Sequence, residues 1–330
     1  MINIKLPEAR RREIAQEYYD RLVRYIDNHA YWSISDNAKA KVKAERDTET
    51  EKEKAEKAKA NEMMSYISEH RREYFLSSSG CLKTKSKLFS FRYTIEKTEY
   101  DEASREVKPI TSYGLFVKQM RKIYNGFMQA KYSVHLNNGY WLMKELGVKV
   151  CPYCNNNYIF TISKHDLKVR PEFDHFLPEA LHPSLILSFY NFVPSCPQCN
   201  HLKKVQELDV NPWVGYAVGE EPKFRVDTSK HDFPANPVII IDGENENIRK
   251  LGIKALYNEQ TDYVKDILNK IQAYNPATYR AIVTDFQGIV HTEAELARMI
   301  WGNYTDPSDS DKRPLAKITA DILEQYKKYL

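Results

Sequence analysis

Hydrophobic and polar positions alternate with a helical period along most of this chain. In the segment 7–29, apolar and aromatic side chains (Ile14, Tyr18, Leu22 and Tyr25) recur every three or four residues, with charged residues on the opposite side. Such spacing predicts an amphipathic helix that packs one face on a core. The same period returns in 63–75, 112–146 (with a break near 137–139), 248–274 and 315–329.

Shorter stretches follow the period of two that is typical of strands. Phe89, Phe91, Tyr93 and Ile95 alternate with polar residues, so 88–100 is predicted to form a strand or a hairpin. Further β-prone runs are 158–163, 167–173, 223–226 and 238–241. Together the patterns predict an α+β protein that is mostly α-helical.

The segment 38–60 has almost no large apolar residue and is rich in Ala, Lys and Glu. Its helix propensity is high, yet it has little to bury. It is either a solvated helix, a partly disordered spacer or a coiled-coil arm. The heptad seam that a coiled coil needs is missing, which disfavours the arm.

Composition divides the chain into three regions. A helical N-terminal region (1–147) contains the charged segment, and a helical C-terminal region covers 216–330. Between them, 148–215 contains four of the five cysteines and short β-prone runs. We expect this middle region to be a small metal module set between helical flanks.

Bulk properties exclude several classes of protein. The chain has 330 residues, 42% of them hydrophobic, which is enough for a packed core, and its net charge of +4 permits a nucleic-acid partner without requiring one. It has no P-loop, no apolar run of membrane-spanning length and no apolar secretion signal at its start. A disulfide framework is not expected, because four cysteines are paired in short motifs and Cys81, predicted to be a buried thiol, is left over. We therefore expect a cytoplasmic protein without membrane contact.

Two Cys-x-x-Cys pairs are the strongest chemical signal. They are Cys151-Pro-Tyr-Cys154 and Cys196-Pro-Gln-Cys199. Four thiolates suit a closed, tetrahedral, structural Zn²⁺ site, and paired motifs of this kind are far more specific than a single one. The sequence predicts that these four cysteines bind zinc.

Three polar residues near the cysteines suggest hydrolysis of phosphodiester bonds. Asp174 and His175 lie between the two cysteine pairs, and Asn200 directly follows the second pair. His175 can accept a proton near neutral pH and is the candidate general base. Asp174 and the side-chain carbonyl of Asn200 are oxygen donors that suit catalytic Mg²⁺ or Mn²⁺. A helix starting at Asn200 would complete a β–β–α arrangement.

The segment also resembles a known family. The residues that carry the likeness are Cys151-x-x-Cys154, Asp174-His175-Phe176-Leu177-Pro178, Asn191, Cys196-x-x-Cys199-Asn200 and Lys203. They resemble the HNH endonuclease motif in its four-cysteine zinc form, and the Cys199-Asn200 step is similar to that of phage junction-resolving HNH enzymes. The sequence around Asp174 and Asn191 is also similar to that of HNH subunits of bacterial anti-phage systems such as Septu, which work beside an ATPase.

The resemblance implies a ββα-metal fold and an endonuclease, with DNA the favoured substrate and a role in anti-phage defence. Lys203, Lys204 and His201 would contact phosphate, and Asn191 would fix the loop that orients His175. Glu172 would lie on the same strand face as Asp174, either supporting the site or solvated. The flanks could grip nucleic acid, form a homo-oligomer or dock a partner ATPase. An RNA-cutting toxin and a non-catalytic zinc-finger adaptor remain open alternatives.

Overall fold

The computed structural model describes residues 2–34, 50–93, 100–101, 106–107, 111–128, 138–164, 167–217, 219–274, 276–285 and 292–329. In the N-terminal region the elements are α1 (Glu8–Asn28), α2 (Glu51–Glu69), α3 (Arg71–Phe75), α4 (Leu82–Tyr93), β1 (Tyr100–Asp101), β2 (Glu106–Val107), α5 (Ser112–Met128) and α6 (Asn138–Leu146). In the middle region they are β3 (Ile162–Lys164), β4 (Leu167–Val169), β5 (Glu172–His175), η3 (Pro183–Leu185), η4 (Phe189–Asn191), β6 (Phe192–Ser195) and α7 (Pro197–Lys203).

The C-terminal region adds β7 (Lys223–Val226), β8 (Ile239–Asp242), α8 (Glu246–Lys250), α9 (Ile253–Asn258), α10 (Thr261–Ala273), α11 (Pro276–Asp285), α12 (Glu293–Trp301), η5 (Pro307–Asp309), α13 (Ala316–Gln325) and η6 (Lys327–Tyr329). The described strands pair in antiparallel twos, as β1–β2, β3–β4, β5–β6 and β7–β8. Helices dominate and the sheets are small, so the predicted α+β, mostly α class is confirmed for the described residues.

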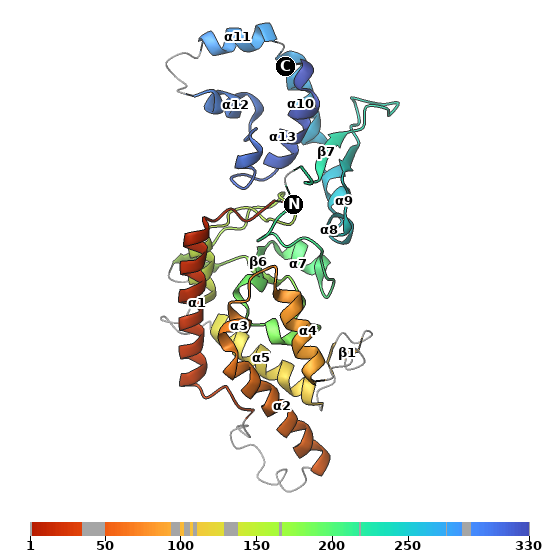
Figure 1. Ribbon diagram of the computed structural model, residues 1–330. Helices are drawn as coiled ribbons and strands as arrows, with labels where there is room; N and C mark the ends of the chain where they lie inside the picture. Colours follow the sequence, from red (N-terminus) through yellow and green to blue (C-terminus); the bar gives the residue numbers. More distant parts are fainter. Residues whose placement is uncertain are drawn as a thin grey trace.

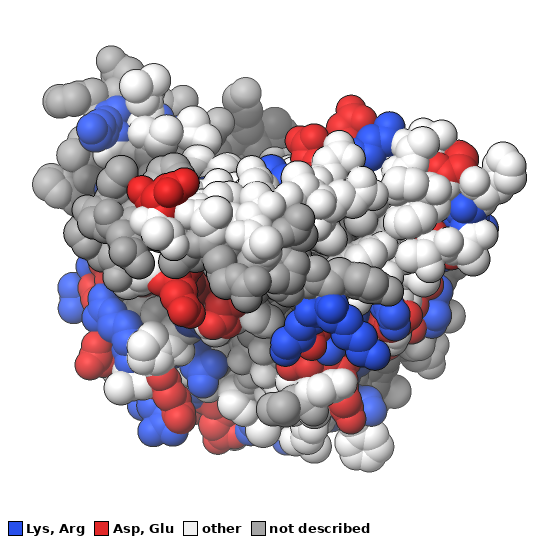
Figure 2. Space-filling view, turned by 90° about the horizontal axis from the view of Figure 1, so that it is seen from above, with Lys and Arg blue, Asp and Glu red and all other residues white. Residues whose placement is uncertain are grey.

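The cysteine-bearing segment lies between two helical groups (Figure 1). α1 runs along one side, α2 to α5 gather at one end, and α10 to α13 gather at the other, with β6 and α7 in between. On the face shown in Figure 2, basic and acidic side chains are interspersed, and the described residues form no broad patch of one sign.

Helix α1 agrees with its predicted pattern. Ile14, Tyr18, Leu22 and Tyr25 are all buried along one face. The Tyr18 hydroxyl donates to the carbonyl oxygen of Leu187 at 3.0 Å, which ties this helix to the middle region. Buried side chains from Ile4 to Leu323 form a single cluster that draws on all three regions. The three-part division of the chain stays a prediction.

Helix α2 shows how part of the charged segment is ordered. Thr50 and Glu53 form a capping box, in which the Thr50 side chain accepts from the Glu53 backbone and Glu53 accepts from the Thr50 backbone. The helix that follows buries residues only from Ala60 onward, so its first turns are solvated. This agrees with the solvated helix, one of the alternatives predicted for this segment. Residues 35–49, which include the start of the 38–60 segment, lie outside the described residues.

The strand or hairpin predicted for 88–100 is wrong over its first part, where α4 continues to Tyr93. Phe89 and Tyr93 are buried one helical turn apart, whereas Leu88 and Phe91 are 54% and 88% exposed. The alternation in sequence therefore did not reflect a strand with one buried face. Residues 94–99 lie outside the described part.

Three further expectations can be compared with the structure. The segment 112–146 contains α5 and α6 as predicted. Its break was expected near 137–139, and there Asn138 and Gly139 begin α6, while 129–137 lie outside the described residues. Cys81 is exposed, which corrects its expected burial. Among the helices described, none is both long and apolar enough to cross a membrane.

Candidate active site and metal centre

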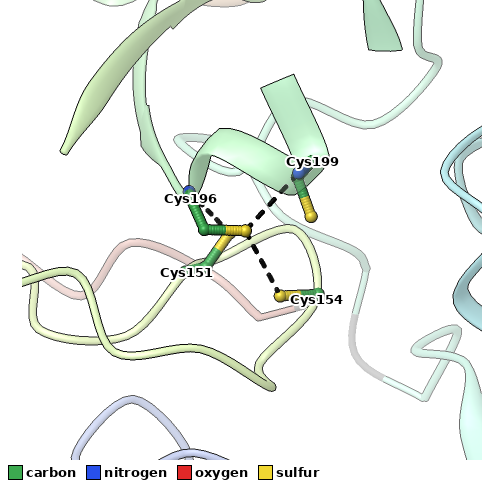
Figure 3. A group of neighbouring side chains, drawn as sticks. All are labelled: Cys151, Cys154, Cys196 and Cys199. Carbon is green, nitrogen blue, oxygen red and sulfur yellow. Dashed lines mark hydrogen bonds between the residues drawn. The ribbon is translucent and has the colours of Figure 1, made fainter. Parts of the chain in front are cut away.

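The four paired cysteines converge on one buried point. Their sulfur atoms all lie within 4.8 Å of one another. Figure 3 shows that Cys151 and Cys154 come from a loop, and that Cys196 and Cys199 come from the start of α7. The Sγ atoms of Cys154 and Cys196 are 3.9 Å apart, close to the roughly 3.8 Å expected between two sulfurs that share a tetrahedral zinc ion. This group could hold a metal ion such as zinc.

Hydrogen bonds to the sulfurs favour the thiolate form. The backbone N–H of Asn156 donates to Cys154 Sγ at 3.4 Å, and the backbone N–H of Cys196 donates to Cys151 Sγ at 3.4 Å. The side-chain amide of Asn157 donates to Cys196 Sγ at 3.3 Å. Donors around sulfur are what a metal-bound thiolate needs. Burial raises the pKa of the Cys151 thiol well above its ordinary value, so a bound cation would be required to keep that thiol ionised.

The second cysteine pair begins a helix earlier than predicted. α7 starts at Pro197 with Cys196 as its N-cap, and Asn200 lies one turn inside the helix rather than at its start. Proline suits the first helical turn, which explains why the helix can begin there. The order of β5, β6 and α7 still agrees with a β–β–α arrangement.

Strand β5 places its neighbouring residues on opposite faces. β5 pairs with β6 in antiparallel register, with Asp174 opposite Val193 and His175 opposite Phe192. Because side chains alternate along a strand, Glu172 and Asp174 face α7. His175 faces α5, where its ring centre lies 4.9 Å from that of Tyr124.

Asp174 is almost fully buried and already has partners. Its Oδ1 accepts from the ammonium group of Lys203 at 3.1 Å, and its Oδ2 accepts from the Tyr153 hydroxyl at 2.5 Å. Burial, followed by the negative charge of Asp174, raises the pKa of Tyr153 well above its ordinary value, so this tyrosine remains a donor. A cation bound to Asp174 would share its carboxylate with both groups or displace Lys203.

Lys203 lies in a different place from the one its sequence position suggests. Its side chain is fully buried, and its ammonium group also donates to the carbonyl oxygen of His175 at 2.7 Å. The expected contact of Lys203 with a phosphate is therefore corrected, because this side chain is enclosed and its charge is paired. Sequence spacing had placed Lys203 near Asn200, but it could not show that the residue points into the protein.

His175 is held in one defined orientation. Its Nε2 atom lies 3.0 Å from the carbonyl oxygen of Ile186. A carbonyl can only accept, so Nε2 carries the hydrogen and Nδ1 of the neutral ring keeps its lone pair. Burial lowers the pKa of His175 below its ordinary value, and the nearby carboxylate of Glu179 partly opposes this effect. The ring is therefore unprotonated at neutral pH.

Asn200 and Glu172 meet across the strand and the helix. The side-chain amide of Asn200 donates to Glu172 Oε2 at 2.7 Å. Both residues are accessible to solvent, unlike Asp174. The structure thus gives Glu172 a direct partner in the candidate site. Its position two residues before Asp174 is the sequence signal for this contact.

Asn191 is fully buried and bridges the connection after β5. Its side-chain oxygen accepts from the Leu177 backbone at 2.8 Å, and its amide donates to the carbonyl oxygens of Leu177 and Leu185 at 3.1 and 3.2 Å. These bonds hold the loop that leads to Ile186, the partner of His175. Asn191 lies away from solvent and is linked to the partner of His175 through this loop.

A cavity of about 870 Å³ brings the polar residues together. Asp174, His175 and Asn200 all line it, although they lie on different faces of β5 and on α7. Several other residues of its wall were not among the candidate site residues predicted from the sequence: Arg121, Tyr124, Tyr140, Lys168, Arg170 and Glu179. Lys204 lines the same cavity, whereas His201 is exposed on α7 and is not part of its wall.

The first cysteine pair is also anchored to the regions before and after it in the sequence. The Ile2 backbone donates to the carbonyl oxygen of Pro152 at 2.8 Å, and the Tyr257 hydroxyl donates to that of Cys154 at 2.6 Å. Asn155, fully buried and left-handed with φ of 53°, accepts from the backbones of Leu315 and Lys317. The loop is thus fixed by segments far away in the sequence.

Comparisons with protein-family models, with curated proteins and with solved structures found no match to this chain.

Proposed function

We propose that this protein is a metal-dependent endonuclease that hydrolyses phosphodiester bonds, with DNA as the favoured substrate. The observation that carries the proposal is the convergence of Asp174, His175 and Asn200 on one cavity. The resemblance to HNH endonucleases names the same three residues. It also extends the proposal to an effector of anti-phage defence that works beside an ATPase.

His175 would act as the general base. The lone pair on Nδ1 can take a proton from an attacking water, because Nε2 is occupied by the Ile186 carbonyl. The lowered pKa keeps this lone pair free at neutral pH. Aromatic contacts with Tyr124 and Phe192 fix the plane of the ring.

The cavity also offers oxygen donors for a divalent cation. The carboxylates of Glu172 and Asp174 and the amide oxygen of Asn200 are the donors that Mg²⁺ or Mn²⁺ prefers. When bound there, such a cation would stabilise negative charge on the phosphate and the leaving oxygen. Glu172 and Asn200 are the more accessible donors, whereas Asp174 is already neutralised by Lys203.

The remaining residues have supporting roles. Lys204 and Arg121 in the cavity wall would attract the phosphate backbone. Zinc at the four cysteines would fix the start of α7, and through it Asn200, against β5. We infer a structural role for this zinc because all four ligand positions would be filled by protein, leaving none for substrate.

One observation favours the alternative of a non-catalytic zinc-finger adaptor. Asp174 is enclosed and ion-paired, as expected of a residue that stabilises the fold. The endonuclease proposal accounts for more of the site, because an adaptor has no need of an oriented, unprotonated histidine beside an open cavity.

The test is cleavage of supercoiled plasmid and of structured RNA by the full chain in Mg²⁺ or Mn²⁺. We expect nicking of the plasmid, and we expect His175→Ala to reduce it by about 10²- to 10⁴-fold. His231→Ala is the matched control, since His231 is exposed in a turn outside the cavity. Equal nicking by the His175→Ala protein rejects His175 as the base, and cleavage of RNA alone selects the toxin alternative.

A further inference from the structure

The β3–β4 hairpin and the segment that leads into it, from Tyr158, have apolar side chains on the outside. Tyr158, Phe160 and Ile162 are 47%, 52% and 44% exposed, while Ile159 between them is buried. On the returning strand, Leu167 and Val169 are 68% and 58% exposed. A sheet normally buries its apolar face and exposes its polar one. A concentration of apolar groups in water marks an interaction surface.

These side chains form one continuous face. Ile162 is paired directly with Val169, and Lys164 with Leu167, so each pair lies on the same side of the sheet. Tyr158 and Phe160 continue that side at two-residue spacing, and their rings stack with centres 4.7 Å apart and planes 21° apart. We call this surface the hairpin face; it consists of Tyr158, Phe160, Ile162, Lys164, Leu167 and Val169.

The hairpin leads directly into the candidate active site. Lys168, Val169 and Arg170 line the same cavity as Asp174 and His175. Lys164 and Lys168 are both exposed, Lys164 on the hairpin face and Lys168 on the opposite face toward the cavity. In this register Lys164 and Leu167 form the far end of the hairpin, whereas Phe160 and Arg170 both adjoin the other end. A ligand lying along the hairpin face would therefore meet Lys164 first, and then the stacked rings and the cavity wall.

We propose that the hairpin face binds unpaired nucleotides of a nucleic-acid strand and guides the adjoining phosphodiester bond into the cavity. Exposed aromatic rings that share a face with a lysine suit a single strand, because bases stack on the rings while phosphates contact the ammonium group. Paired bases inside a duplex do not offer their faces to such rings. Guiding of the phosphodiester bond into the cavity rests on the proposed function, whereas binding of a single strand at the hairpin face does not.

Binding is measured with the full chain carrying His175→Ala, so that the probe stays intact. The probes are a fluorescein-labelled single-stranded DNA of mixed sequence, the same sequence as RNA, and the DNA as a blunt duplex. Stacking contributes about 1–3 kcal/mol per base, so adding Tyr158→Ala and Phe160→Ala should weaken single-strand binding at least tenfold. The matched control is Phe91→Ala, which removes an aromatic ring that is 88% exposed on α4.

The results separate the two proposals. Tight single-strand binding that is lost in the double variant but kept in Phe91→Ala supports the hairpin face, and the DNA and RNA probes distinguish the source of the strand. Absence of single-strand binding, or equal binding by the double variant, overturns it. The proposal is also overturned if the double variant changes from dimer to monomer while its single-strand binding is unchanged, because the hairpin face then serves as a contact between protein chains. If single strands bind through the hairpin face but the protein with His175 intact cuts no probe, the proposed function is rejected while the proposal for the hairpin face stands.

Discussion

The ammonium nitrogen of Lys203 lies 3.1 Å from Oδ1 of Asp174, and both side chains are almost completely buried. The ion pair fastens α7 to β5 at the point where the candidate site opens. A charge enclosed in this way requires its partner, because an unpaired buried charge is strongly unfavourable.

Lys203→Met is expected to destabilise the protein by about 3–5 kcal/mol, since it leaves the Asp174 carboxylate enclosed without its counter-charge. The measurement is chemical denaturation of the full chain. Adding Asp174→Asn should recover part of the loss, because a neutral amide then replaces the unpaired carboxylate. Lys204→Met, one residue further on and exposed, is the matched control and should leave stability nearly unchanged. A Lys203→Met protein as stable as the parent would show that the ion pair does not form.

Asn191 and Asn200 should respond differently to replacement by alanine. Asn191→Ala removes three buried hydrogen bonds to Leu177 and Leu185 and should reduce stability by about 2–4 kcal/mol. Asn200→Ala removes one bond, to Glu172, and should reduce cleavage while stability changes by less than about 1 kcal/mol. Thermal denaturation and plasmid nicking, measured on both variants, check this contrast. Equal losses of stability would assign Asn200 a structural role.

The four cysteines should bind about one zinc ion per chain. Cys154→Ser or Cys199→Ser should release this zinc and lower the unfolding temperature, because binding of structural zinc contributes to folding. Metal content by mass spectrometry and calorimetric melting are the measurements. Cys81→Ser, which alters an exposed thiol outside the cluster, should change neither quantity. A soluble Cys199→Ser protein with an unaltered melting temperature contradicts the metal centre.

Cleavage should persist at mildly acidic pH. A general base must be unprotonated, and burial lowers the pKa of His175 below its ordinary 6.5. Activity should therefore fall only as the pH drops through that lowered pKa, so the acid midpoint of kcat/KM lies below 6.5. The Glu179 carboxylate raises the pKa of His175. Glu179→Gln should accordingly move the midpoint to still lower pH, and a midpoint that moves upward would count against His175 as the titrating base.

Local spacing was sufficient to predict the features that depend on neighbours in sequence. The apolar stripe of α1 and the two cysteine pairs both follow from short spacings, because a helix face and a Cys-x-x-Cys motif are each built within a few residues. Asp174, His175 and Asn200 were also selected from residue type and spacing, and all three line one cavity.

Contacts between distant segments could not be predicted in the same way. The burial of Lys203 depends on how α7 packs on β5, and the hydrogen bond from His175 to Ile186 depends on the loop held by Asn191. The helix at Phe89 and Tyr93 was misread because Phe91, exposed on the far side, imitated a strand pattern. Each of these outcomes is decided by tertiary packing rather than by local sequence.

The left-handed turn at Asn155 has a consequence for the architecture of the protein. This single buried amide joins the first cysteine loop to the segment that begins α13, while Ile2 is bonded to the same loop from the other end of the sequence. The four-cysteine cluster is thus not self-contained: a fragment covering 148–215 alone would lose the hydrogen bonds from Ile2 and from the start of α13 that hold the loop of Cys151 and Cys154. Conversely, any change in the shape of this loop should reach α13, more than a hundred residues away in sequence, through the hydrogen bonds of Asn155.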